Sequence, residues 1–153
     1  MVPFLRTAWT EVVSPMLNRP ALVQIAALCM RETKSGDEVL LVTSSNGRWI
    51  LPKGWPIDGM SGSQTALQEA WEEAGVKNAR AAKEPIGTYD GKKTVDNGIE
   101  RDCRVYVYAI EVEKLADKFP EKDKRKRKWV PFDQAAEFVD DADMAKFLRA
   151  LKG

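Results

Sequence analysis

The chain has 153 residues, a length at which one domain buries roughly 70% of the surface of its unfolded chain. Its 24 basic and 23 acidic residues leave a net charge of +1, so no overall charge attracts it to nucleic acid or to a membrane. The absence of histidine excludes histidine-based proton transfer and histidine metal ligands, and leaves carboxylates for both tasks.

No segment predicts export or membrane insertion. The longest apolar run near the start, residues 21–30, is interrupted by Gln24 and is about half as long as a membrane span. Cys29 and Cys103 lie in apolar runs and are interpreted as buried, reduced thiols. We therefore expect a cytoplasmic protein.

The first residues predict an N-terminal arm rather than a packed element. Pro3, Pro15 and Pro20 break any long helix there. We expect an arm over residues 1–19 and a single domain over residues 20–153.

The first half of this domain predicts strands. Residues 21–31 and 38–43 are apolar, and the sequence KSGD between them is typical of a turn. Asn46 and Gly47 mark a second turn, which leads into a short strand over residues 48–51.

The segment from Gly54 to Val76 carries the strongest chemical pattern. Its spacing predicts a helix over residues 63–74, with Ser61 or Ser63 as N-cap and Gly75 as left-handed C-cap. Within that helix, glutamates recur at positions i, i+3 and i+4 and therefore project from one face. These are Glu69, Glu72 and Glu73, and the opposite side is apolar, with Leu67, Ala70, Trp71 and Ala74.

Three clustered carboxylates repel one another unless a cation lies among them, and hard oxygen ligands suit Mg²⁺ or Mn²⁺. An acidic solvent-facing helix is the simpler alternative. The preceding sequence LPKGWP favours a site instead, because a strand, a glycine–lysine loop and an acidic helix together provide contacts for phosphate and metal.

The second half of the domain predicts short strands over residues 76–83 and 85–89. A longer strand over residues 101–112 has apolar residues on both faces, which predicts a central strand covered on each side. A further strand is expected over residues 128–132. Asp133 is expected to cap a helix that extends to Val139, and residues 143–151 form the last helix. This order predicts an α/β fold with a mixed sheet between helices.

Gly54 and the sequence QEAWEEAGV from Gln68 to Val76 resemble the Nudix box of pyrophosphohydrolases. That box reads Gly, five residues, Glu, seven residues, then Arg-Glu-apolar-any-Glu-Glu-any-Gly-apolar. The spacing agrees without a gap, but Met60 replaces the first Glu and Gln68 replaces the Arg. Because a Glu and an Arg are lost together, no charge is left unpaired.

The resemblance implies the Nudix αβα sandwich with a central mixed sheet, and a metal-dependent hydrolase of phosphoanhydrides. It implies Mg²⁺, or Mn²⁺, as cofactor. The catalytic residues and metal ligands it implies are Glu69, Glu72 and Glu73, with a backbone carbonyl from Lys53 or Gly54 as a further ligand. Which glutamate is the base stays open.

A narrower resemblance concerns the substrate. Segments spread over residues 20–140 are similar to the diphosphoinositol polyphosphate phosphohydrolases and to bacterial relatives that also cleave diadenosine polyphosphates. It implies that polar and basic residues surround a small polyphosphate. The positions here are Arg31, Ser44, Ser45, Arg48, Lys53, Arg101, Arg104 and Lys128, together with the basic run over residues 124–128.

Simpler alternatives remain for parts of this set. The basic run is also typical of a solvated loop or edge strand, and Arg48 could pair with an acidic neighbour. A hydrolase of another nucleoside-diphosphate-linked substrate is a second possible function. A non-catalytic phosphate-binding module with a degenerate box is a third. We expect no nucleic-acid or membrane partner, and either a monomer or a homodimer.

Overall fold

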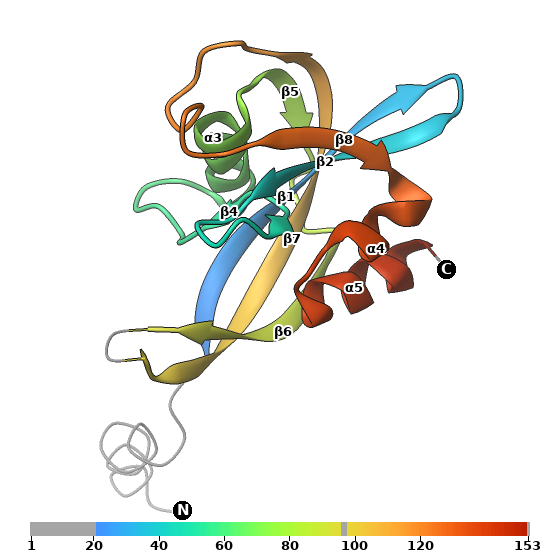
Figure 1. The fold of residues 1–153 in the computed structure, drawn as a ribbon. Helices are drawn as coiled ribbons and strands as arrows, with labels where there is room; N and C mark the ends of the chain where they lie inside the picture. Colours follow the sequence, from blue (N-terminus) through green and yellow to red (C-terminus); the bar gives the residue numbers. More distant parts are fainter. Residues whose placement is uncertain (1–20, 96–97, 153) are drawn as a thin grey trace, which may run out of the picture.

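The computed structural model describes residues 21–95 and 98–152, so the arm expected over residues 1–19 lies outside the described residues. Within that part, the strands form one mixed sheet (Figure 1). They are β1 (Leu22–Thr33), β2 (Gly36–Thr43), β3 (Trp49–Ile50), β4 (Lys53–Gly54), β5 (Val76–Ala81), β6 (Gly87–Thr94), β7 (Glu100–Leu115) and β8 (Arg127–Pro131). The helical segments are α3 (Gly62–Ala74), η3 (Phe132–Gln134), α4 (Ala135–Phe138) and α5 (Ala142–Lys152).

The centre of the sheet is the parallel pair β1 and β7. Leu22 lies opposite Cys103, and the register continues to Met30 opposite Glu111. Antiparallel strands flank this pair: β2 and β4 pair with β1, while β5 and β6 pair with β7. A central parallel pair is covered on both faces, which explains the nearly continuous apolar run of β1.

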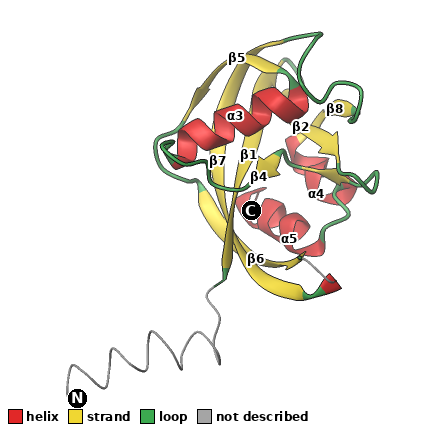
Figure 2. Ribbon diagram, turned by 90° about the vertical axis from the view of Figure 1, so that its left-hand side faces the viewer, coloured by secondary structure: helices red, strands yellow, loops and turns green. Residues whose placement is uncertain are grey.

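Helices cover both faces of the sheet, which confirms the predicted sandwich (Figure 2). One buried cluster places the alanines of α3 against Ile25, Leu40 and Ile110. The other places Met144 and Leu148 of α5 against Leu28, Leu41 and neighbouring strand residues. Cys29 and Cys103 are free, buried thiols in different clusters, as the sequence predicts.

Most element boundaries differ from the predicted ones by a few residues. The last strand lies over Arg127–Pro131, where residues 128–132 were expected. The larger differences come from pairing. The strand expected over residues 85–89 lies over Gly87–Thr94, where it pairs with the start of β7. β4 was not predicted as a strand, since its two residues form one only by pairing with Ile25 and Ala26.

The prediction that Asp133 caps a helix is wrong. Asp133 lies inside the 3₁₀ turn η3, and α4 follows from Ala135 without a side-chain cap. The aspartate that caps a helix is Asp141, whose Oδ1 accepts from the amides of Asp143 (3.0 Å) and Met144 (3.1 Å) at the start of α5. None of the helices in residues 21–95 and 98–152 is long and apolar enough to cross a membrane.

Candidate active site on helix α3

The capping residues predicted for α3 are confirmed. Ser61 is the N-cap and forms a capping box with Gln64, in which each side chain accepts from the other residue's amide. Gly75 ends the helix in the left-handed conformation, with φ of 71°. Both ends of the helix are therefore fixed by local sequence, and this sets which side chains face the sheet.

Gly54 and Glu69 are in direct contact. A Cβ added at position 54 would overlap the carboxyl group of Glu69, 2.6 Å from its Oε2. Only a residue without a side chain lets the carboxyl group approach the backbone of β4 so closely. This packing explains why glycine stands at the first position of the box.

Glu73 is buried, contrary to the prediction that the acidic face of α3 lies opposite its packed face. Its exposed fraction is 3%, and Ala70 and Ala74 beside it are also buried. Its Oε1 has no hydrogen-bond partner among the described residues. Its Oε1 lies 3.6 Å from the guanidinium of Arg125, an ion-pair distance that exceeds hydrogen-bond length.

Glu69 and Glu73 share a hydrogen bond between their side chains. Burial, and after it the bond to Glu69, raise the pKa of Glu73 to about 9. Burial also raises the pKa of Glu69, while the bond to Glu73 lowers it. One proton shared by two close carboxyl groups is the arrangement expected where no cation separates them.

Glu72 is engaged elsewhere. Its Oε1 accepts a hydrogen bond from Gln68 Nε2 at 3.2 Å, so the neutral residue at the box arginine position contacts a box glutamate. Within the described part of the chain, no three Asp, Glu or Cys side chains converge as a ready-made metal cluster. The structure thus brings Glu69, Glu73 and Gly54 together and leaves Glu72 beside them.

These groups fit a hard divalent cation. The fit rests on the unpartnered, buried Oε1 of Glu73 and on the carboxyl group of Glu69 held against the backbone of Gly54. A cation between the two carboxyl groups would displace their shared proton and neutralise the buried charge.

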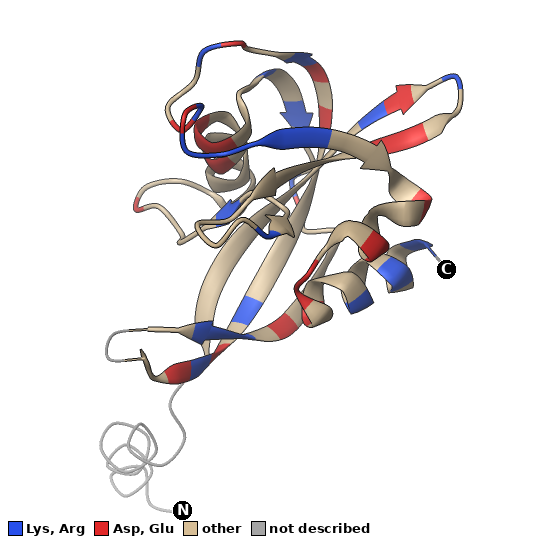
Figure 3. Cartoon of the chain, viewed as in Figure 1, with Lys and Arg blue, Asp and Glu red and all other residues tan. Residues whose placement is uncertain are grey.

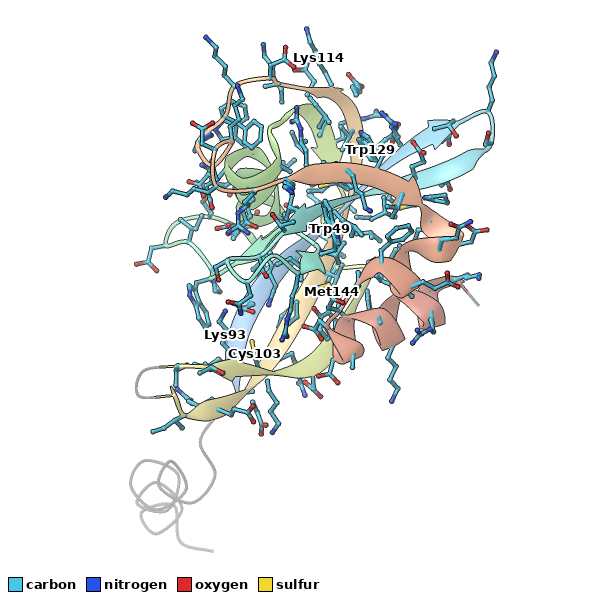
Figure 4. The ribbon with its side chains drawn as sticks, in the orientation of Figure 1. Trp49, Lys93, Cys103, Lys114, Trp129 and Met144 are labelled. Atoms are coloured by element: carbon cyan, nitrogen blue, oxygen red, sulfur yellow. The ribbon has the colours of Figure 1, made fainter. Side chains whose placement is uncertain are left out.

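Lys53 points to the opposite side of the sheet from Glu69. It pairs with Ala26, whose side chain belongs to the cluster under α5, and its Nζ donates to Gln24 Oε1 at 3.1 Å. Burial lowers the pKa of Lys53, and the nearby charge of Lys93 on β6 adds to this effect. Lys93 lies near Cys103 (Figure 4).

The other predicted contact residues are spread over the sheet. Arg31 pairs with Glu38 at 2.7 Å and lies over the ring of Trp129. Lys128 places its Nζ 4.6 Å from the ring centre of Trp49 and 4.3 Å from that of Phe138. Arg104 pairs with Asp90 at 2.9 Å on the exposed start of β7.

The remaining predicted residues occupy a turn and a strand. The amide of Ser44 donates to the carbonyl of Arg48, and the amide of Arg48 to Ser44 Oγ, so they close the β2–β3 turn that contains Ser45. Arg101 lies opposite Lys93 in the β6–β7 pairing.

An open hollow of about 460 Å³ lies elsewhere, lined by Met30, Ala81, Ala109 and their neighbours. Its arginines already have partners: Arg31 pairs with Glu38, and Arg80 with Glu111. We assign it no anion, because its lining has three acidic residues against two arginines.

Beside the glutamates lie Glu121, which was not predicted as a site residue, and Arg125, which was expected only as a member of the basic run around the substrate. Arg125 and Glu121 come from the segment that joins β7 to β8, about fifty positions after the helix. The basic run over residues 124–128 was the available signal, but it could not show which of its members turns inward. Figure 3 shows this basic segment beside the acidic part of α3.

Comparison with known proteins shows the family of the chain. A family model described as NUDIX domain matches residues 22–151. "Nudix hydrolase 13, mitochondrial" of Arabidopsis thaliana is 32% identical over 125 residues, which are 74% of this chain and 61% of the relative. "Diphosphoinositol polyphosphate phosphohydrolase 3-beta" of Homo sapiens is 33% identical over 114 residues, 72% of this chain and 64% of the relative. The chain therefore spans somewhat less than two thirds of either relative.

A solved structure shows the same fold. The Ap4A hydrolase of C. elegans superposes with a TM-score of 0.62 and 18% identity, covering 87% of this chain and 97% of that one. At this identity the likeness concerns the fold alone. The match of the family model over nearly all of the described residues, together with the two curated relatives, shows that the chain belongs to the Nudix hydrolase family.

Proposed function

We propose that the chain is a metal-dependent pyrophosphohydrolase that cleaves a phosphoanhydride bond in diphosphoinositol polyphosphates or diadenosine polyphosphates. The observation that carries the proposal is the pair Glu69 and Glu73, with a buried, unpartnered carboxyl oxygen beside Gly54. Two close carboxyl groups, one with a buried oxygen that accepts no hydrogen bond, lower the stability of the fold, so the pair is expected where the groups bind a cation.

The metal residues in this proposal are Glu69, Glu72, Glu73 and the carbonyl of Gly54, and the metal is Mg²⁺ or Mn²⁺. Such a cation, when bound, neutralises phosphate charge and lowers the pKa of water. Glu72 lies three residues, or about one helical turn, after Glu69 and accepts a hydrogen bond from Gln68. In this proposal it completes the metal shell or accepts a proton from water, and the choice between Glu72 and its neighbours as base stays open.

The substrate residues proposed are Arg31, Ser44, Ser45, Arg48, Lys53, Arg101, Arg104 and Lys128. Lys53 adjoins Gly54 in the chain and its described hydrogen-bond partner is the neutral amide of Gln24, although its side chain lies on the face of the sheet opposite Glu69. The human relative is named for diphosphoinositol polyphosphates, which supports that substrate class. Arg31, Arg104 and Lys128 would have to exchange their present partners for phosphate.

We further propose a cytoplasmic protein that acts as a monomer or homodimer and has no nucleic-acid or membrane partner. The balanced charge supports the absence of both partners. Two Arabidopsis relatives are named mitochondrial, so fractionation of cells is the measurement for location.

A product-release assay tests the activity. The protein is incubated with Mg²⁺ or Mn²⁺ and, separately, diadenosine tetraphosphate, diadenosine hexaphosphate, diphosphoinositol pentakisphosphate, ADP-ribose and nucleoside triphosphates. We expect turnover of one of the first three, and loss of at least about 100-fold in Glu73→Gln with the fold retained. Turnover of ADP-ribose or a nucleoside triphosphate alone would establish the alternative hydrolase.

Tight binding without turnover would establish the phosphate-binding module instead. That function is favoured by the two departures from the box, Met60 and Gln68. An equal rate for Glu73→Gln and the unaltered protein would remove Glu73 from the catalytic residues.

A further inference from the structure

The segment that joins β7 to β8 is fastened to the C-terminal end of α3 at several points. The amide of Glu121 donates to the carbonyl of Glu72 at 2.9 Å, and the amide of Ala116 to that of Gly75 at 2.7 Å. Arg127 donates to the carbonyl of Ala74 at 2.7 Å. These bonds satisfy carbonyl groups that a helix end leaves free, so the segment is held in one place relative to the box.

Arg125 projects from this segment toward Glu73 and is itself held on two sides. Its Nε donates to Glu121 Oε1 at 2.9 Å, and its NH1 donates to the carbonyl of Thr43 at the end of β2 at 2.8 Å. Thr43 is fixed in turn, because its Oγ1 accepts from the amide of Lys126 at 2.9 Å. A planar guanidinium with several donors can make such contacts at once, and a lysine cannot.

The contact with Glu73 is electrostatic. The NH1 of Arg125 lies 3.6 Å from Glu73 Oε1, and the side chains are only 20% and 4% exposed. Charges interact more strongly in such a position than at the surface, while the distance leaves the lone pairs of Oε1 unused. The oxygen therefore stays available to a cation.

The box itself supplies no arginine here. Gln68 occupies that position and gives a neutral amide to Glu72. The positive charge beside the glutamates is that of Arg125, which comes from the segment between β7 and β8.

Resting on the proposed function, we propose that Arg125 is a positioning residue: its guanidinium, anchored by Glu121 and Thr43, holds Glu73 in the orientation that binds the metal. Arg125 then acts through Glu73 and does not contact the substrate. The proposal explains why this arginine is turned inward, whereas its neighbours Lys124 and Lys126 are exposed.

The test compares Arg125→Gln, Arg125→Lys and the control Lys122→Gln, which removes the same charge from an exposed position of the same segment. Mn²⁺ binding to the protein without substrate is measured by electron paramagnetic resonance. The product-release assay at saturating Mg²⁺ gives kcat and KM. Groups that orient a metal ligand change metal affinity or activity by about 10–100-fold when replaced. For Arg125→Gln we expect a Kd for Mn²⁺ about tenfold higher and a lower kcat, with KM within about twofold. Arg125→Lys should fall between it and the unaltered protein, and Lys122→Gln should change neither quantity.

A raised KM with unchanged kcat and Mn²⁺ affinity would overturn the proposal, because it would identify Arg125 as a phosphate contact. Unchanged values in all three variants would overturn it as well. If Arg125→Gln fails to fold, as judged by circular dichroism in EDTA, Arg125→Lys decides by the same two quantities. Should the protein hydrolyse none of the substrates, the proposed function fails, while the Mn²⁺ affinities still decide whether Arg125 positions Glu73.

Discussion

At position 54 the space for a side chain is occupied by the carboxyl group of Glu69. Gly54→Ala should therefore push this carboxyl group away from β4, although the backbone there does not require glycine. We expect Mn²⁺ affinity and turnover to fall at least about tenfold, since a metal ligand displaced by an ångström loses most of its contribution. Isothermal titration with Mn²⁺ and the product-release assay measure the two effects.

Gly91→Ala on β6 is the matched control for this change. A Cβ at position 91 would lie 3.5 Å from Asp143 Oδ2, an ordinary van der Waals contact, and it is remote from the glutamates in the fold. It should change neither Mn²⁺ affinity nor turnover. If both alanine variants bind Mn²⁺ as the unaltered protein does, the contact between Gly54 and Glu69 has no part in metal binding.

The buried acid of Glu73 also predicts how stability depends on pH without metal. Its pKa is raised from 4.5 to about 9, chiefly by burial, so folding takes up a proton between these values. Below about pH 4.5 the carboxyl group of Glu73 is protonated in both states and does not lower the free energy of unfolding. As pH rises toward 9 the unfolded chain loses this proton, and the free energy of unfolding declines. Glu73→Gln removes the part of this decline that comes from Glu73. In EDTA, its advantage in free energy of unfolding should be small near pH 4.5 and should grow up to pH 8. Urea titrations at four pH values measure it, and a constant difference would contradict the assigned burial.

The sequence predicted the helix that carries the three glutamates better than the surroundings of that helix. Helical periodicity places Glu69, Glu72 and Glu73 on one stripe, because that property is local. Periodicity could not show that Glu73 is buried and lies beside Arg125, because Arg125 comes more than fifty positions later in the chain. Contacts between distant segments depend on how the loop folds back.

Among the elements, α3 depends on the cap that precedes it. Ser61→Ala removes the acceptor for the amide of Gln64 and should lower the free energy of unfolding by about 0.5–2 kcal/mol. Ser61→Asp keeps an acceptor there and should retain most of the stability. Urea denaturation of the three proteins decides, and equal losses in both variants would show that capping is not the cause.

The distinction between local patterns and contacts of distant segments also explains which elements were predicted. The strands β1, β2 and β7 and the helix α3 follow from apolar patterns and capping residues within each segment. β4 has two residues and exists through its pairing with β1, so no local pattern marks it. Asp133 was misplaced for a similar reason. Aspartate favours helix starts in general, but here Asp141 meets the free amides of a helix and Asp133 lies within a 3₁₀ turn.

In the whole molecule, the sheet separates two cores. Leu40 and Leu41 are neighbours on β2 and fully buried, but Leu40 packs in the cluster with the alanines of α3, and Leu41 in that of α5. Each change to alanine should lower the free energy of unfolding by about 2–5 kcal/mol, because each leaves a cavity in a close-packed interior.

The two variants should differ at the metal site. Leu40→Ala loosens the support of α3 and should weaken Mn²⁺ binding, measured where more than nine tenths of the protein is folded. Leu41→Ala, with a similar loss of stability, should leave Mn²⁺ affinity unchanged, since α5 lies on the other face from Glu69 and Glu73. Equal weakening in both would mean that the faces of the sheet do not act independently, and that metal binding depends on the stability of the domain as a whole.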